Sequence, residues 1–167
     1  MSRAFVKEDD QEEIPIISPR AHLPAGETNY VTPVGLQKLM DEREVLLHER
    51  STLDIADANE RRIALLVLNG KLQLLNDRIN SARPIDLGSQ DKESIRFGAQ
   101  IQLKVQATGK LQTLQIVGVD EADISKGKIA FTSPLAKILN HKKVGEVATL
   151  KLENGNRVFE ILKIEYS

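Results

Sequence analysis

The hydrophobic pattern of the chain changes its period once, near Pro84, and this change most constrains the fold. From Ile95 onward apolar and polar residues alternate, which predicts a strand with one buried face. Before Pro84 the spacing is instead three and four in turn, a heptad seam typical of paired helices. This seam comprises Leu65, Leu68, Leu72, Leu75, Ile79 and Ala82. An α+β protein is therefore expected, with helices first and a small sheet after them.

A first helix is expected to pair with the heptad helix as an antiparallel coiled-coil hairpin over residues 30–86. Thr32 suits the N-cap position and Pro33 the first helical position, and the helix should run to about Ser51. Arg43 and Arg50 interrupt the apolar seam of this helix. Two alternatives stay open: the arginine side chains extend to the edge of the interface, or the pairing loosens toward the hairpin tip.

Residues 87–167 predict a separate small domain, a mainly antiparallel β-sheet with one short helix on its face. A turn is expected at residues 108–110, and Ser133 followed by Pro134 marks the start of the short helix. Asn154 and Gly155 form the turn signal of a last hairpin.

Residues 1–29 are expected to be a disordered acidic tail. Acids outnumber bases there six to three, and Pro15, Pro19 and Pro24 are spaced too closely for a helix. Such a segment buries too little apolar surface to offset its ordering entropy.

Composition excludes several classes of protein. A net charge of -1 provides no global positive field for nucleic acid, and the absence of cysteine excludes disulfides and thiolate sites. The longest apolar run, residues 63–68, is far below the ~20 residues that span a bilayer. The first residues lead into acids rather than an apolar signal segment. We therefore expect a cytoplasmic monomer without membrane contact.

Motifs for nucleotide binding or nucleophilic catalysis are not found, so no catalytic residue, intrinsic metal site or enzyme activity is expected. His22, His48 and His141 lie in three different segments and do not make a metal site. Asp54, Asp57 and Glu60 could offer carboxylates to a divalent metal, or simply favour the positive end of a helix dipole.

A basic group follows in the second domain: Lys126, Lys128, Lys137, His141, Lys142 and Lys143. It is either a contact face for RNA or an acidic protein, or a solvated surface.

Several segments of the C-terminal part are distinctive in order and spacing: residues 97–99, 116–123, 133–136 with Leu139, 145–146 and 164–166. Over about 70 residues these segments resemble the bacterial transcription elongation factors GreA and GreB. Residues 30–39 and 82–86 are similar to the entry into the first coiled-coil helix of the family and the exit from the second.

This resemblance implies a coiled-coil hairpin joined to a domain like the FK506-binding proteins. In the family that domain docks on RNA polymerase at its secondary channel, and two acids at the hairpin tip help the polymerase cleave backtracked RNA. The docking residues implied here are Thr132, Ser133 and Pro134, with Thr132 standing where a family aspartate can precede the serine. Contact with nascent RNA or DNA would be indirect. No cofactor of its own is expected for the chain, and the metal implied by the resemblance is Mg²⁺ shared with the polymerase active site.

The tip departs from the family motif Asp-Leu-Ser-Glu-Asn-Ala-Glu-Tyr. In the nearest match Asp54 and Asp57 hold the acid positions and Arg61 replaces the tyrosine. An ungapped count back from residues 84–86 places Ser51 and Asp54 there instead, which leaves one acid.

The first arm, from Gly35 to Asp54, is about a dozen residues shorter than in the family, a deficit of ~18 Å. The leading hypothesis is a polymerase-binding regulator with weak or no stimulation of transcript cleavage. The alternatives are an active cleavage factor acting through Asp54 and Asp57, and a peptidyl-prolyl isomerase suggested only by the fold.

Overall fold

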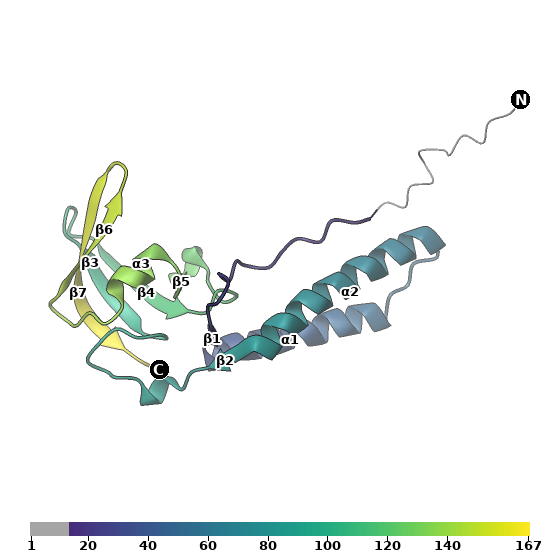
Figure 1. Ribbon diagram of the computed structural model, residues 1–167, viewed down its shortest axis with the longest axis horizontal. Coiled ribbons are helices and arrows are strands. Elements are labelled where there is room, and N and C mark those ends of the chain that lie inside the picture. Colours follow the sequence, from purple (N-terminus) through teal and green to yellow (C-terminus); the bar gives the residue numbers. More distant parts are fainter. Residues whose placement is uncertain (1–13) are drawn as a thin grey trace, which may run out of the picture.

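Side-chain caps start both helices of the hairpin in the computed structural model, which describes residues 14–167 (Figure 1). Helix α1 spans Pro33–Ser51, and the hydroxyl of Thr32 accepts a hydrogen bond from the Gly35 N–H at 2.9 Å. Helix α2 spans Ala58–Ser81 and is capped by Asp57. The N-cap at Thr32 and the helix end at Ser51 are as the sequence predicts.

The seam between α1 and α2 is built mainly of leucine. Leu75 is fully buried, and the other buried members are Leu39, Leu46, Leu68 and Leu72. Arg50 extends to the edge of this interface, where its guanidinium donates a hydrogen bond to the Asn69 side-chain oxygen at 2.9 Å. Arg50 therefore behaves as the first alternative expects. No residue between Leu46 and Leu68 is buried, so the packing is densest toward the base of the hairpin and looser toward its tip, as the second alternative expects.

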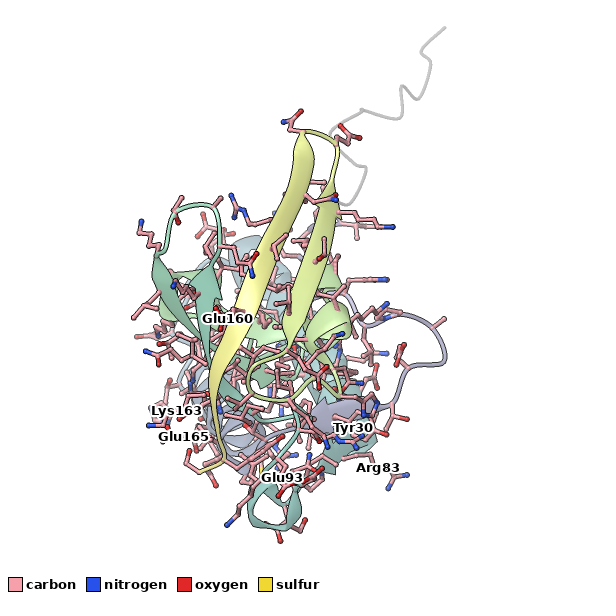
Figure 2. All side chains as sticks on the ribbon, turned by 90° about the vertical axis from the view of Figure 1, so that its left-hand side faces the viewer. Tyr30, Arg83, Glu93, Glu160, Lys163 and Glu165 are labelled. Carbon is pink, nitrogen blue, oxygen red and sulfur yellow. The ribbon has the colours of Figure 1, made fainter. Side chains whose placement is uncertain are left out.

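Two short strands close the base of the hairpin, which the sequence did not predict. Strand β1 (Asn29–Val31) pairs in parallel with β2 (Ala82–Pro84), so that Tyr30 lies opposite Arg83, as their labels in Figure 2 show. Segments of three residues are too short to show a period of two. The two strands are also far apart in sequence, because β1 precedes α1 and β2 follows α2.

The second domain contains five strands: β3 (Gln100–Val105), β4 (Leu111–Val117), β5 (Lys128–Ala130), β6 (Val147–Leu152) and β7 (Gly155–Glu165). They form one sheet with the order β5-β4-β3-β7-β6. All neighbours are antiparallel except β4 and β5, which are parallel. Two short 3₁₀ helices, η2 (Leu87–Ser89) and η3 (Ile124–Lys126), lie in its connections, and helix α3 (Pro134–Leu139) covers one face.

Strand β3 begins five residues later than the alternation from Ile95 predicts. Gly98 has a φ of +86°, a left-handed conformation that breaks the extended chain, and a Cβ there would come within 2.1 Å of the Leu87 side chain. Ile95 is nonetheless fully buried, because its side chain packs in the core of the sheet domain, and its backbone N–H donates to the Lys142 carbonyl at 2.8 Å. The pattern therefore reports burial at Ile95 correctly but not strand geometry.

The sheet domain has a hydrophobic core separate from that of the hairpin. Ala136 and Leu139 of α3 pack onto apolar side chains of the sheet, which include Ile101, Leu103, Leu114, Ile116, Phe159 and Ile161. None of the helices among residues 14–167 is long and apolar enough to cross a membrane.

Part of the predicted tail differs from expectation. Residues 1–13 lie outside the described residues, whereas residues 14–28 run beside the hairpin and then enter β1 (Figure 1). Arg20 in this segment makes ion pairs with Glu42 and Asp120, so the segment has fixed contacts that composition did not reveal.

Candidate functional site

The hairpin tip carries the two predicted acids in the link between α1 and α2, far from the sheet domain (Figure 1). Asp54 and Asp57 are both exposed. The Asp57 carboxylate accepts a hydrogen bond from the Glu60 N–H at 2.9 Å, whereas Asp54 precedes the helix, so the acids do not share a helical face. Within residues 14–167 no group of three or more His, Cys, Asp or Glu side chains could hold a metal ion. A full set of oxygen ligands at the tip would need groups from a partner.

The predicted docking residues lie where β5 leads into α3. Ser133 is the N-cap of α3, and its hydroxyl accepts a hydrogen bond from the Ala136 N–H at 3.3 Å. Pro134 is exposed at the first helical position, and Thr132 is half-buried. Ser133 therefore has a structural role, and Pro134 presents its ring to solvent.

An aromatic cluster lies beside these residues and includes a side chain from the hairpin base. The Tyr30 ring lies 5.9 Å from that of Phe97 and 5.5 Å from that of Phe131, and these two rings are 5.6 Å apart. The three rings line a hollow of about 230 Å³ together with Lys137 and Asn140 of α3. Ligand sites usually enclose about 300–1,000 Å³, so this hollow does not support the isomerase alternative.

Two of the five lysines of the predicted basic group are engaged by acids. The Lys126 amine lies 4.0 Å from an Asp123 oxygen, and the Lys128 amine lies 3.8 Å from a Glu121 oxygen. The remaining lysines, Lys137, Lys142 and Lys143, lie on α3 and in the turn after it.

Glu121 joins the sheet domain to the start of α1. Its carboxylate is 4% exposed and accepts a hydrogen bond from the Thr32 hydroxyl at 2.7 Å. A Cβ at Gly35 would lie 2.8 Å from the same carboxylate, and one at Gly118 would lie 2.5 Å from the Tyr30 carbonyl oxygen. Two glycines therefore allow the close approach, and the positive end of the α1 dipole favours the buried charge.

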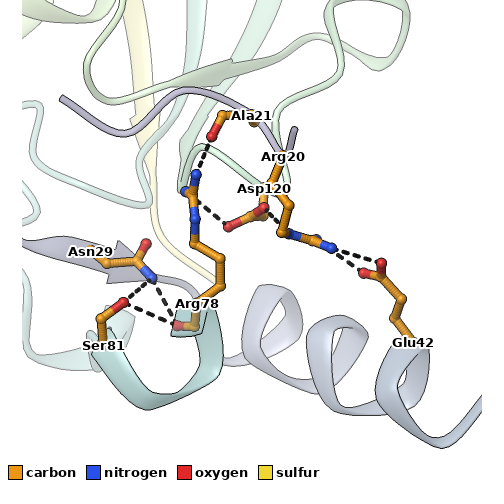
Figure 3. Close-up of polar contacts among 7 residues, drawn as sticks. All are labelled: Arg20, Ala21, Asn29, Glu42, Arg78, Ser81 and Asp120. Atoms are coloured by element: carbon orange, nitrogen blue, oxygen red, sulfur yellow. Dashed lines mark hydrogen bonds and ion pairs between the residues drawn. The ribbon is translucent and has the colours of Figure 1, made fainter. Parts of the chain in front are cut away.

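Asp120 makes a second connection, to two arginines (Figure 3). One oxygen accepts a hydrogen bond from the Arg20 Nε at 3.0 Å, and the other accepts one from Arg78 at 3.4 Å. Arg20 also donates to both oxygens of Glu42, at 2.8 and 3.0 Å. Hydrogen bonding to Glu42, with a further contribution from Asp120, raises the pKa of Arg20 above its ordinary value.

Sequence reasoning missed this junction. Asp120 and Glu121 lie within residues 116–123, which resemble the family, but the sequence indicates no role for either carboxylate. Arg20 is 100 residues away from Asp120, and Thr32 is 89 residues away from Glu121. No periodicity or local motif connects positions so far apart, whereas the N-cap signal at Thr32 was visible.

Comparison with known proteins now identifies the family. The model of the family described as "Transcription elongation factor, GreA/GreB, C-term" matches residues 90–166. The chain is 38% identical over 99 residues to transcription elongation factor GreA of Acidiphilium cryptum, a match that covers 59% of this chain and 63% of that relative. It is 33% identical over 151 residues to transcription elongation factor GreA of Flavobacterium johnsoniae, with 81% of this chain and 96% of the relative covered.

Two solved structures are also similar. The GreA factor homolog 1 (Gfh1) of Thermus thermophilus has 23% identity and a TM-score of 0.38, with 83% of this chain and 99% of that chain covered. A GreA/GreB factor from Nitrosomonas europaea has 14% identity and a TM-score of 0.42, with 82% and 98% covered. The sequence match along nearly all of the Flavobacterium relative decides the assignment, and the chain therefore belongs to the GreA/GreB family of transcription elongation factors.

Proposed function

We propose that this protein is a transcription elongation regulator that binds RNA polymerase at the secondary channel and stimulates transcript cleavage weakly or not at all. The observation that carries the proposal is the length of the first arm. Helix α1 has 19 residues and ends at Ser51, only three residues before Asp54. At 1.5 Å per residue this helix is ~28 Å long.

Arm length matters because metal ligation is short-ranged. A carboxylate oxygen must lie within roughly 2.0–2.6 Å of Mg²⁺ or Ca²⁺ to coordinate it. The resemblance to the family implies an arm about a dozen residues longer, so Asp54 and Asp57 would stop ~18 Å short of the polymerase metal if docking follows the family mode. The tip would then occupy the channel without contributing to cleavage.

Docking is assigned to Thr132, Ser133 and Pro134. Support comes from the exposed ring of Pro134 and from the aromatic hollow beside α3, which gives this face apolar character. The partner contact would be with protein, and contact with nascent RNA or DNA would be indirect. Lys137, Lys142 and Lys143 on and after α3 would meet acidic groups of the partner.

The decisive experiment adds the purified protein to stalled, backtracked elongation complexes and measures RNA shortening and polymerase binding in parallel. Binding without efficient shortening is expected, together with inhibition of cleavage driven by an active family member. The double variant Asp54→Asn, Asp57→Asn should inhibit equally well. Asparagine is as good an N-cap as aspartate, so this variant keeps the start of α2 while it removes both charges.

A matched pair of variants tests the docking residues. Pro134→Glu places a charge at the first position of α3, and Pro33→Glu places the same charge at the first position of α1. Both residues are exposed and each follows a hydroxyl N-cap. Polymerase binding should weaken at least tenfold in Pro134→Glu and stay unchanged in Pro33→Glu. Equal binding by the two folded variants would show that the docking surface lies elsewhere.

The exposure of Asp54 and Asp57 favours one second candidate, an active cleavage factor. In that case the acids would share Mg²⁺ with the polymerase active site. Robust RNA shortening by the unmodified protein, lost in the double asparagine variant, would establish this function and refute the arm-length argument.

A further inference from the structure

We infer that residues 17–29 form a strap that fixes the angle of the helical hairpin on the sheet domain, with Arg20 as the positioning residue. The inference concerns the free protein and stands whether or not the proposed function is correct. It rests on contacts that the strap makes with both bodies (Figure 3).

Arg20 is the central contact of the strap. Its guanidinium binds Glu42 on α1 through two hydrogen bonds and Asp120 of the sheet domain through a third. The Arg20 side chain is 18% exposed and that of Asp120 is 6% exposed, so water screens this contact less than a surface pair. One side chain therefore ties three segments together: the strap, the hairpin and the sheet domain.

The strap is held at two further points near the hairpin base. Arg78 of α2 donates a hydrogen bond to the Ala21 carbonyl and another to Asp120. Asn29, where the strap enters β1, is 2% exposed and donates to the Arg78 carbonyl at 3.0 Å. Asp120 thus receives one arginine from the strap and one from the hairpin.

A notch in α2 accepts the start of the strap. Gly70 has no side chain, and a Cβ at this position would lie only 1.9 Å from the Ile17 Cδ1 atom. Glycine is otherwise unfavourable inside a helix by about 0.5–1 kcal/mol relative to alanine. The fit of Ile17 over Gly70 gives this glycine a structural reason.

The positions of these contacts explain why the strap sets an angle. The direct contacts between the hairpin and the sheet domain, such as Thr32 to Glu121 and Arg78 to Asp120, all lie at the base of the hairpin. Contacts confined to one end of a long hairpin oppose its rotation only weakly. Glu42 lies ten residues further along α1, which is ~15 Å from Thr32. A second attachment at this distance from the first opposes rotation of the hairpin.

Distance measurement between spin labels tests the strap in the full chain. The protein has no cysteine, so Glu49→Cys on α1 and Lys151→Cys on β6 provide unique label sites. Both side chains are exposed. Double electron–electron resonance should give one narrow distance distribution in this background. Arg20→Gln should at least double the width of the distribution, or shift its maximum by several ångströms.

Arg50→Gln is the matched control, because it removes an arginine that joins α1 to α2 away from the junction. Its distribution should equal that of the labelled parent. An unchanged distribution in Arg20→Gln would overturn the inference.

Trypsin cleavage after Arg20 provides an independent readout with other variants. Glu42→Gln removes the ion pair with Arg20, and Gly70→Ala displaces Ile17. Each variant should therefore speed cleavage of the Arg20–Ala21 bond about threefold or more. Mass spectrometry of the early products measures this rate, and Glu49→Gln, further along α1, should cleave as the wild type does. Equal rates in all four proteins would show that residues 17–29 are not held against the hairpin.

Discussion

Asp120 and Glu121 are neighbours in sequence, yet they hold different parts of the molecule. Glu121 binds the Thr32 hydroxyl at the start of α1, whereas Asp120 receives Arg20 and Arg78. Both carboxylates are nearly buried, at 4% and 6% exposure. Buried charges of this kind are tolerated when opposite charges or hydrogen bonds meet them. Adjacent acids after β4 therefore make the connection between the hairpin and the sheet domain.

Gly118→Ala should loosen this connection. Its Cβ would lie 2.5 Å from the Tyr30 carbonyl oxygen, a backbone atom that cannot move without β1. Overpacking of this size typically costs about 1–3 kcal/mol. Urea unfolding of the variant should show that loss. Gly88→Ala is the control, because its Cβ would meet only the Asp86 side chain at 3.3 Å, and its stability should stay within about 0.5 kcal/mol of wild type.

Tyr166→Phe should destabilise the sheet domain at neutral pH. The Tyr166 hydroxyl donates to the Ser94 carbonyl and accepts from the Arg96 N–H, each at 2.7 Å. Its loss leaves two partly buried groups without this partner, at a cost of about 1–3 kcal/mol in denaturant unfolding. An unchanged free energy of unfolding would contradict a structural role for this hydroxyl.

The same residue gives a pH dependence with a definite sign. Burial raises the pKa of Tyr166 above its ordinary value of 10.0. When the pKa of a group is higher in the folded state than in the unfolded state, the group stabilises the fold at pH values below its unfolded-state pKa. This stabilisation is lost as the pH rises through the folded-state pKa. Wild-type stability should therefore fall above about pH 10 relative to Tyr166→Phe, so the difference between the two proteins narrows there.

At the scale of elements, local signals were the predictable part of the fold. The heptad leucines identified α2, and the cap at Thr32 identified α1, because both signals operate within a few residues. The alternation also identified the sheet, apart from the late start of β3. The β1–β2 pair and the partners of Asp120 and Glu121 were not predictable, since long-range contacts between short segments leave no period in a single sequence.

Leu72→Ala tests the packing of the hairpin. Leu72 is 4% exposed at the centre of the α1–α2 seam, so truncation should cost about 2–5 kcal/mol. Leu66→Ala on the same helix is the control, because Leu66 is 42% exposed and its truncation should cost far less. Thermal unfolding that does not separate the two variants would show that no packed seam exists.

At the scale of the whole molecule, the two hydrophobic cores are separate, and the two bodies meet through polar contacts and through the aromatic cluster of Tyr30, Phe97 and Phe131. One core lies between α1 and α2, and the other lies between the sheet and α3. The junction combines ion pairs, a buried threonine and close backbone approach at Gly118. An interface of this kind permits relative motion of the two bodies unless further contacts oppose it, which gives the strap its importance.

Arm length should decide activity at this scale. A matched heptad inserted into both α1 and α2 keeps the seam in register and adds ~10 Å, so two heptads add ~21 Å. Under the proposed docking mode, the wild type and the one-heptad protein should inhibit cleavage by an active factor. The two-heptad protein should instead stimulate RNA shortening in backtracked complexes. Inhibition by all three proteins would show that the tip acids do not stimulate RNA cleavage even when the arms are two heptads longer.

The parallel pairing of β1 with β2 has a consequence for how the chain assembles. Its two strands flank the whole hairpin, so they can meet only after α1 and α2 have brought Tyr30 and Arg83 together. Closing a long loop costs entropy before any contact repays it, and the paired helices reduce that cost because they hold the two strands close together. We therefore expect the helical arms to pair first and the β1–β2 pair to close their base afterwards.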